Sequence, residues 1–198
     1  DMNKDSRLFF QMVRDFLTVY LPKQKAASQN TIESYRIALN KYLDFSCNEL
    51  KIGLVSYGFQ HSSRELLEKY LEKMEKEGNW SVSSRNQRLA AIRRFYRYAA
   101  ERNPSVMSCY QEMALIPVKK ENEHEIEFFS ENALEAILAV ADVSSKKGRR
   151  DLVFMILLYD TGARIQEMLD ICLNDLHIRS DEKYVVLTGK GGKTRLVP

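Results

Sequence analysis

The sequence has little of what secreted, disulfide-bonded or membrane-spanning proteins require. Its three cysteines, Cys47, Cys109 and Cys172, are odd in number, far apart and outside metal-ligand spacing, which favours a reducing compartment. No apolar run reaches the roughly 18–20 residues that a membrane span needs. The opening DMNKDSRLFF lacks the basic region and long apolar stretch of a secretory signal. These absences predict a cytoplasmic protein without a membrane span.

Histidine and glycine are also sparse, and their spacing does not suit the common cofactor sites. His61, His124 and His177 have no carboxylate or cysteine at a ligand spacing, so neither a metal site nor a histidine-activated nucleophile is predicted. The GKGGK stretch at 189–193 fails the G-x-x-x-x-G-K-[ST] spacing, and a strand rather than a helix follows it. ATP binding is therefore disfavoured, and we expect no cofactor.

The composition is that of an ordinary globular protein, but its charge is unevenly distributed. The 198 residues are 44% hydrophobic and 29% charged, which suffices for one large or two ordinary soluble domains. The net charge is only +3, yet residues 81–102 carry six arginines against the single acid Glu101, a local excess of five charges. Residues 121–127 are rich in acids instead.

Hydrophobic periodicity predicts helices throughout the first half. Apolar residues recur every three or four positions from Leu8 to Tyr20, which predicts an amphipathic helix that ends near Pro22. A second helix is predicted to open with Asn30 as N-cap and Glu33 three residues later.

Two further helices complete the first domain. The third begins at Ser62 or Ser63 and ends at Gly78, and the fourth runs from about Ser83 to Arg102. Four such helices can close a small core.

A linker is predicted after the fourth helix. Pro104 stops that helix, and the stretch that follows contains Pro117 and lacks sustained periodicity. We therefore divide the chain into a helical domain at 1–103, a linker at 104–128 and a second domain at 129–198.

The second domain is predicted to combine helices with a hairpin. Ser130 caps a helix, and the uncharged run Leu152–Tyr159 predicts a second helix that is buried nearly all round. A short helix carries Ile165, Met168 and Leu169. Tyr184–Thr188 and Thr194–Val197 are predicted strands, joined by a glycine-rich turn. The predicted fold is mainly α, with a four-helix N-terminal domain and a mixed α+β part.

The arginines of the fourth helix are candidate nucleic-acid contacts. Arg93, Arg94 and Arg97 lie to the flank and back of the apolar stripe, whereas Arg85 and Arg88 point in the apolar direction within the first turns. Guanidinium groups near a helix N-terminus can bind backbone phosphates. Alternatively, the helix has a solvated face with intrahelical ion pairs, but it contains few acids to form them. That scarcity favours DNA or RNA.

Arg164 is a sharper candidate within the stretch TGARIQEMLD at 161–170. It follows the predicted buried helix closely, and a guanidinium beside a core is costly unless an anion meets it. Glu167, three residues on, lies on the same helical face and can orient the guanidinium. The alternative is a partly buried structural pair.

Lys190 gains significance from its neighbours. Gly189, Gly191 and Gly192 leave the turn without side chains, so that a bulky partner can approach closely. Lys193 continues the positive charge along the next strand, as does Arg195. The alternative is an ordinary glycine-rich turn with a solvated lysine.

These motifs together resemble the tyrosine recombinase (phage integrase) family. The resemblance rests on TGARIQEMLD followed by KYVVLTGKGGKTRLVP, and on NTIESYRIALNKYLDF and SSRNQRLAAIRRFYRYA in the first half. The combination of T-G-x-R-x-x-E with a G-K-G-x-K-x-R hairpin is specific. The resemblance covers nearly the whole chain and implies a SAM-like core-binding domain followed by the first part of an integrase catalytic domain.

The resemblance implies a role for each motif residue. Arg164 corresponds to the first catalytic arginine, which would clamp a scissile DNA phosphate, and Glu167 to the acid that supports it. Lys190 corresponds to the hairpin lysine that protonates the leaving 5′-hydroxyl. The residues assigned to DNA contacts are Arg85, Arg88, Arg93, Arg94, Arg97, Thr31, Tyr35, Arg36, Lys193 and Arg195.

The sequence also departs from the family pattern. The family requires a later H-x-x-R element, a further His or Trp and a tyrosine nucleophile, none of which follows before Pro198. Tyr159 and Tyr184, in the predicted buried helix and first strand, do not take the nucleophile's place. We expect a fragment that binds DNA weakly and cleaves nothing, from a parent that cuts and rejoins DNA through a 3′-phosphotyrosyl intermediate.

The helices that would cover the hairpin in a whole catalytic domain are not part of this sequence, and their absence predicts self-association. Val185, Leu187, Leu196 and Val197 are expected to be left bare, so the fragment would associate, as a dimer, through its open strand edge. The parent would act as a tetramer on DNA. Two alternatives remain open: a non-catalytic DNA-binding module or decoy, and a helical interaction protein whose arginines meet acidic partners.

Overall fold

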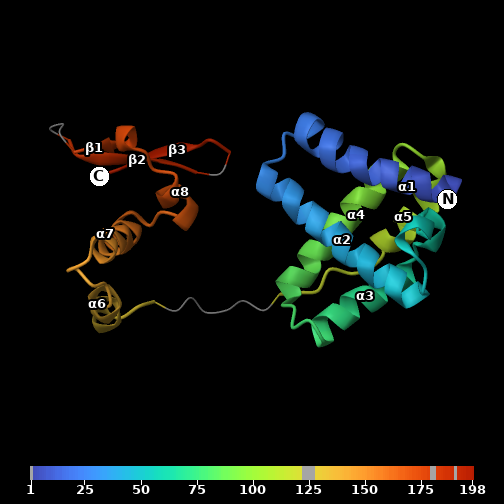
Figure 1. The fold of residues 1–198 in the computed structure, drawn as a ribbon, viewed down its shortest axis with the longest axis horizontal. Coiled ribbons are helices and arrows are strands. Elements are labelled where there is room, and N and C mark those ends of the chain that lie inside the picture. The colour runs from blue at the N-terminus through green and yellow to red at the C-terminus, as the bar shows by residue number, and fades with distance from the viewer. Residues whose placement is uncertain (1, 122–127, 179–181, 190) are drawn as a thin grey trace. The chain divides into compact units, whose positions relative to one another are not determined.

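The computed structural model describes residues 2–121, 128–178, 182–189 and 191–198 and divides the chain into two compact units. Unit 1 is Asp1–Glu123 and unit 2 is His124–Pro198, and both are drawn in Figure 1. Within the described ranges, every helix is too short or too polar to cross a bilayer.

Unit 1 consists of helices, most of which begin at a serine or asparagine cap. Its elements are α1 (Lys4–Asp15), the π-helix η1 (Phe16–Gln24), α2 (Gln29–Leu50), the 3-10 turns η2 (Leu54–Ser56) and η3 (Phe59–His61), α3 (Arg64–Lys76), α4 (Val82–Ala100), the 3-10 turn η4 (Pro104–Val106) and α5 (Met107–Ala114). Ser63 and Ser81 each accept the N–H three residues on, which satisfies one donor of the helix start.

Two details differ from the sequence-based expectation. Pro22 does not end the first helix but lies inside η1, because the wider i→i+5 turn accommodates a ring that the α-helical pattern rejects. The N-cap of α2 is Ser28, whose Oγ accepts the N–H of Thr31, and Asn30 lies inside the helix. Two capping residues so close together cannot be distinguished by composition alone.

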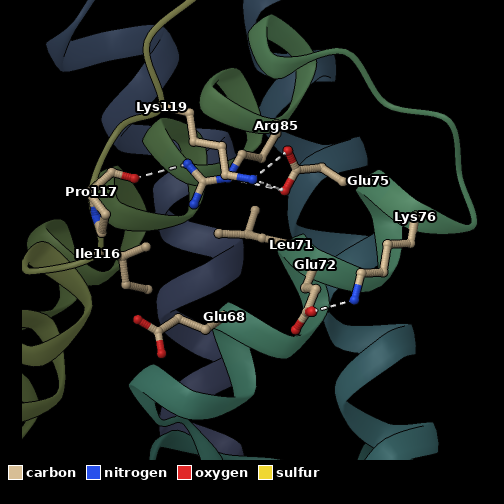
Figure 2. A pocket seen from close by; sticks show the side chains of 9 residues that line it. All are labelled: Glu68, Leu71, Glu72, Glu75, Lys76, Arg85, Ile116, Pro117 and Lys119. Carbon is tan, nitrogen blue, oxygen red and sulfur yellow. Dashed lines mark hydrogen bonds and ion pairs between the residues drawn. The ribbon is translucent and has the colours of Figure 1, made fainter.

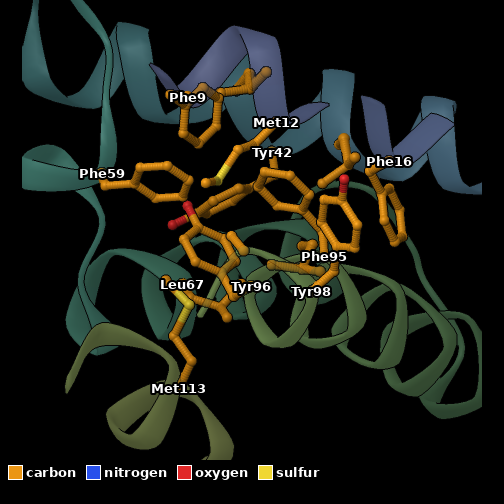
Figure 3. Close-up of a cluster of buried hydrophobic side chains, with 14 of the residues drawn as sticks. Phe9, Met12, Phe16, Tyr42, Phe59, Leu67, Phe95, Tyr96, Tyr98 and Met113 are labelled. Carbon is orange, nitrogen blue, oxygen red and sulfur yellow. The ribbon is translucent and has the colours of Figure 1, made fainter. Parts of the chain in front are cut away.

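Aromatic side chains fill the core of unit 1 (Figure 3). Phe9 packs edge-on against Phe59 and Phe95, with ring centroids 4.9 and 5.6 Å apart, and Phe16 packs edge-on against Phe95 at 5.6 Å. Edge-to-face pairs of this kind contribute about 0.5–1.5 kcal/mol beyond the area that they bury. Tyr70 packs against Trp80 in the same way.

The beginning of the predicted linker belongs to this core. Residues 104–114 form η4 and α5, and Val106, Met113 and Ile116 are buried within unit 1. The expectation of an aperiodic segment was therefore wrong for these residues. The helix is only eight residues long, too short for a hydrophobic period to stand out against the prolines around it.

Unit 2 combines short helices with a three-stranded antiparallel sheet in the order β1-β2-β3. Its elements are α6 (Glu131–Ala139), α7 (Lys146–Thr161), α8 (Ile165–Leu169), the 3-10 turn η5 (Leu173–Asp175), β1 (Leu176–His177), β2 (Tyr184–Thr188) and β3 (Thr194–Val197). Both predicted strands and the Ser130 cap are confirmed. β1, a two-residue strand paired with Val185 and Tyr184, was not predicted.

The core of unit 2 is small, and α7 is not buried all round as we expected. Among the described residues its buried cluster is Met168, Val185 and Leu187. Val153 and Tyr159 on α7 are 55% and 62% exposed. The expectation that both Val185 and Leu187 are bare was wrong, because they face α8. On β3, Leu196 is bare as expected, at 65% exposed, whereas Val197 is partly buried against this cluster.

Candidate functional site

The candidate site is built around the buried carboxylate of Glu167. Gly162 ends α7 in the left-handed conformation, with φ of 58°, and α8 then begins with Arg164 as its N-cap. Glu167, at the third position of α8, turns back so that its Oε2 accepts the Arg164 backbone N–H at 3.1 Å. The acid is only 5% exposed, and it therefore needs positive partners.

Two arginines from different elements supply that charge. Arg164 Nη1 donates to Glu167 Oε1 at 2.7 Å, and Arg195 Nη2, from β3, donates to Oε2 at 2.8 Å. The hydrogen bond from Arg195, then those from the Arg164 backbone and side chain, lower the pKa of Glu167 to about 2. The carboxylate is ionised at neutral pH and holds both guanidinium groups in fixed directions.

Arg164 itself is open to solvent, contrary to the expectation of a guanidinium beside a dry interior. Its side chain is 73% exposed, whereas that of Glu167 is 4% exposed. Among the described residues, Glu167 is the one hydrogen-bond partner of the Arg164 side chain. The buried member of the pair is the acid, and the arginine retains unused donors.

The hairpin turn lies against the same carboxylate. A Cβ added to Gly189 would lie 2.8 Å from Glu167 Oε1, closer than real Cβ contacts allow. Gly189 also donates its N–H to the carbonyl of Lys193 at 2.7 Å, which closes the turn. Lys190 lies outside the described residues, but the residue before it touches Glu167. Lys193 is exposed.

Two arginines of α4 are bound to backbone carbonyls rather than available to DNA. Arg85 is 5% exposed, and its Nη1 donates to the carbonyl of Pro117 at 3.0 Å. Arg93 donates to the carbonyls of Met113 and Ala114, at 2.9 and 3.0 Å. The scarcity of acids in this helix was thus a poor guide, because carbonyl oxygens replace them. The assignment of Arg85 and Arg93 to DNA stays untested, and we do not include them among the contacts proposed below.

Of the other three arginines of α4, Arg97 is exposed, and Arg88 and Arg94 are half-buried. Arg88 donates to the carbonyl of Ser34 at 3.3 Å and lies over the Trp80 ring, and Arg94 donates to the Tyr20 hydroxyl at 2.6 Å. Arg97 pairs with Glu101 and its side chain is 56% exposed. These residues stay predicted DNA contacts.

The candidates on α2 lie at its first turns. Thr31 belongs to the Ser28 cap, and Tyr35 is half-buried with its ring 5.4 Å from Phe16. Arg36 pairs with Glu33 at 2.7 Å, with 43% of its side chain exposed. They too stay predictions.

The sequence did not disclose two features of the site. The first is the close approach of Gly189 to Glu167, for which the glycine itself was the only signal. The second is that Arg195, which we had assigned to DNA, is an ion-pair partner of Glu167. Its position depends on the strand register, which sets Arg195 opposite Leu187 and cannot be read from the sequence. Within the described ranges no three His, Cys, Asp or Glu side chains gather as a metal site.

Comparison with known proteins decides the family. The model of the phage integrase N-terminal SAM-like domain matches residues 14–103, and that of the phage integrase family matches residues 127–198. The chain belongs to the phage integrase family. This confirms the resemblance drawn from the motifs, and it confirms a mainly α fold with a SAM-like N-terminal domain.

Relatives of this integrase-family chain carry recombinase names. The protein y4rD of Sinorhizobium fredii, named as an integrase/recombinase, is 29% identical over 191 residues, which are 96% of this chain and 68% of y4rD. The tyrosine recombinase XerC of Staphylococcus saprophyticus is 29% identical over 178 residues, 90% of this chain and 56% of the relative. The chain thus spans between half and about two thirds of these relatives.

The fold is shared with a solved recombinase. The crystal structure of XerH bound to a palindromic difH substrate, a post-cleavage complex, matches with a TM-score of 0.61 and 19% identity. The match covers 99% of this chain and 58% of XerH.

Proposed function

We propose that the whole protein is a site-specific tyrosine recombinase that binds duplex DNA and cuts and rejoins it through a 3′-phosphotyrosyl intermediate. The observation that carries the proposal is an exposed guanidinium, Arg164, fixed by the buried carboxylate of Glu167 beside a glycine-rich hairpin. Such an arrangement suits an extended anion that approaches from solvent. The recombinase names of the relatives support the same conclusion.

The chemistry assigned to each residue follows from its position. Arg164 binds the non-bridging oxygens of the scissile phosphate and stabilises the charge that develops there in the transition state. Glu167 does not touch DNA but holds Arg164 and Arg195 in place. Lys190 protonates the leaving 5′-hydroxyl. The nucleophile is a tyrosine that the family implies, and we assign that role to neither Tyr159 nor Tyr184.

Unit 1 contributes positioning contacts to the DNA backbone. The proposed contacts are Arg88, Arg94, Arg97, Thr31, Tyr35 and Arg36, with Lys193 added from unit 2. Contacts of this kind set register and carry little sequence information. The proposal for the whole protein includes a tetramer on DNA.

Replacing Arg164 with Lys tests the proposed role of the guanidinium. Lysine keeps the charge and can still pair with Glu167, but it cannot bind two phosphate oxygens in parallel. In the whole protein, cleavage of a nicked suicide substrate should fall by roughly 10²–10³-fold, the loss typical for one transition-state donor. Duplex affinity should change by less than about threefold.

The matched control is Arg97→Lys, which makes the same exchange at a proposed positioning contact. Its cleavage rate at saturating enzyme should stay close to that of the unaltered protein. Equal cleavage rates for Arg164→Lys and the unaltered protein would refute the assignment of Arg164.

Salt dependence separates DNA binding from the alternative of an acidic protein partner. Each phosphate contact should contribute a slope of about −0.9 in log affinity against log salt for duplex DNA. A flat response of duplex affinity to salt would remove the DNA proposal for this chain.

A further inference from the structure

Arg93 caps the C-terminal end of α5. The last carbonyls of a helix lack intrahelical donors and carry a partial negative charge. Arg93 Nε donates to the carbonyl of Met113 at 2.9 Å and Nη2 to that of Ala114 at 3.0 Å, and Nη2 also contacts the carbonyl of Ile116. One planar guanidinium on α4 thus binds three carbonyls within residues 113–116, where the chain leaves α5.

Arg85, about two turns earlier on α4, continues this contact (Figure 2). Its Nη1 donates to the carbonyl of Pro117 at 3.0 Å, and its Nε lies 3.7 Å from Glu75 Oε2 on α3. Lys119 reaches the same carboxylate, with its Nζ 2.9 and 2.8 Å from the two Glu75 oxygens. Glu75 therefore joins a cation from α4 to a cation from the segment that follows α5.

Asn86 completes the contact by pairing with the backbone of Lys119 in both directions. Its Nδ2 donates to the Lys119 carbonyl at 2.8 Å, and its Oδ1 accepts the Lys119 N–H at 3.1 Å. A neighbouring strand would satisfy an extended backbone in the same way. Ile116, 2% exposed, adds an apolar contact between the polar ones.

We propose that Arg85, Asn86 and Arg93 form a binding site on α4 for the chain's own residues 115–119, which we call the strap, and that these two arginines hold the strap instead of DNA. The site binds the strap's backbone through carbonyl oxygens and one N–H, and the buried Ile116 and the Lys119–Glu75 ion pair add side-chain contacts. The docked strap fixes the point at which the chain leaves unit 1.

The strap also sets the length of the connection to unit 2. With the strap docked, the connection to Ser130, the cap of α6, begins after Lys119; with it released, the connection begins after Ala114. The five added residues can extend by at most about 18 Å, at roughly 3.3–3.6 Å per residue. Docking therefore restricts how far unit 2 can travel from unit 1.

Amide hydrogen exchange of residues 115–121 in the present chain tests strap docking without any DNA. Arg93→Met removes the hydrogen bonds to the carbonyls of Met113 and Ala114, at the end of α5, and of Ile116, in the strap. Exchange in this segment should therefore accelerate by roughly tenfold or more. Arg93→Lys should accelerate it nearly as much, because an ammonium cannot span three carbonyls. Arg97→Met, the matched change four residues away, should leave it unaltered.

Asn86→Ala provides a second variant whose loss of contacts is too small to unfold unit 1, and it should accelerate exchange of the Lys119 amide. Unchanged exchange in both Arg93→Met and Asn86→Ala would overturn the proposal, as would full protection in Arg93→Lys.

The second half of the proposal is that Arg85 and Arg93 bind the strap instead of DNA. It rests on the proposed DNA binding, and duplex affinity tests it. Arg93→Met should lower affinity by less than about twofold, whereas Arg97→Met should reduce both affinity and salt slope. An equal loss in the two variants would show that Arg93 contacts DNA and would overturn this half. A protein that binds no duplex at all would refute the proposed function but leave the exchange result intact.

Discussion

The two units hold their arginines in opposite ways. In unit 1 the guanidinium of Arg85 is buried, and its partners are the Pro117 carbonyl, the Asn86 side-chain oxygen and the Glu75 carboxylate. In unit 2 the carboxylate of Glu167 is buried and the guanidinium of Arg164 is exposed. A buried arginine that is bound to groups of its own unit serves the fold, whereas an exposed arginine fixed by a buried acid keeps donors for a ligand.

The units also differ in how completely their apolar residues are covered. Aromatic rings from α1, η1, η3 and α4 close the core of unit 1. The described part of unit 2 buries few side chains fully and leaves apolar residues of α7 and β3 exposed. We therefore expect the ion pairs around Glu167 to contribute a larger share of the folding stability of unit 2 than any ion pair contributes in unit 1.

Glu167→Gln should have the largest effect on this contrast. Because the folded-state pKa of Glu167 is lowered to about 2, its ionised form stabilises unit 2 fully above its unfolded-state pKa of about 4.3. That stabilisation is lost as the pH falls through the folded-state value. Thermal unfolding at pH 7 should thus occur at a lower temperature in the variant, and the difference should shrink towards zero near pH 2.

The control for this titration is Glu33→Gln, which removes an exposed acid paired with Arg36 in unit 1. Exposed ion pairs of that kind contribute between about 0 and 1 kcal/mol. A constant difference between Glu167→Gln and the unaltered protein from pH 7 to pH 2 would contradict the role given to the ionised carboxylate.

Local pattern predicted most of the secondary structure and the centre of the site. The strands around the turn, the caps at Ser63 and Ser130, and the pairing of Arg164 with Glu167 all follow from spacings of two, three or four residues. Such features depend on residues that are close in the sequence, so one sequence is sufficient to predict them.

Features that depend on distant segments escaped prediction. Arg85 and Arg93 donate to backbone carbonyls that lie 32 and 20 residues away in the sequence. Carbonyls have no sequence signature. The exposure of α7 likewise depends on what packs against it, which an apolar run does not state. Composition assigned α7 to a buried core, which was wrong, and Arg85 to DNA, which stays untested.

Gly189→Ala should have an intermediate effect, confined to unit 2. The added methyl would meet Glu167 Oε1 at 2.8 Å, and the carboxylate cannot retreat without weakening its bonds to Arg164 and Arg195. We expect the pKa of Glu167, followed by carboxyl carbon NMR, to rise from about 2 towards its ordinary value.

The double variant Gly189→Ala with Glu167→Asp makes room for the methyl, because aspartate is one methylene shorter. Thermal stability should be recovered in part relative to Gly189→Ala alone. Gly191→Ala is the contrasting case: its cost comes from a φ of 79°, and its methyl would meet nothing within 4 Å. A Glu167 pKa that moves equally in Gly189→Ala and Gly191→Ala would contradict the close-contact explanation.

Leu196→Lys should have the smallest effect, and it tests whether the incomplete cover of unit 2 causes self-association. Leu196 lies on β3, at one edge of the sheet, and is 65% exposed. An exposed apolar edge strand can pair with a second copy, and a lysine there opposes such pairing through charge and desolvation. In light scattering over a concentration series, the present chain should dimerise and Leu196→Lys should dimerise severalfold more weakly.

Val153→Lys places the same charge on α7, at a residue 55% exposed, and should leave dimerisation nearly unchanged if the strand edge is the contact. A larger loss in Val153→Lys would move the contact from the strand edge to the helix.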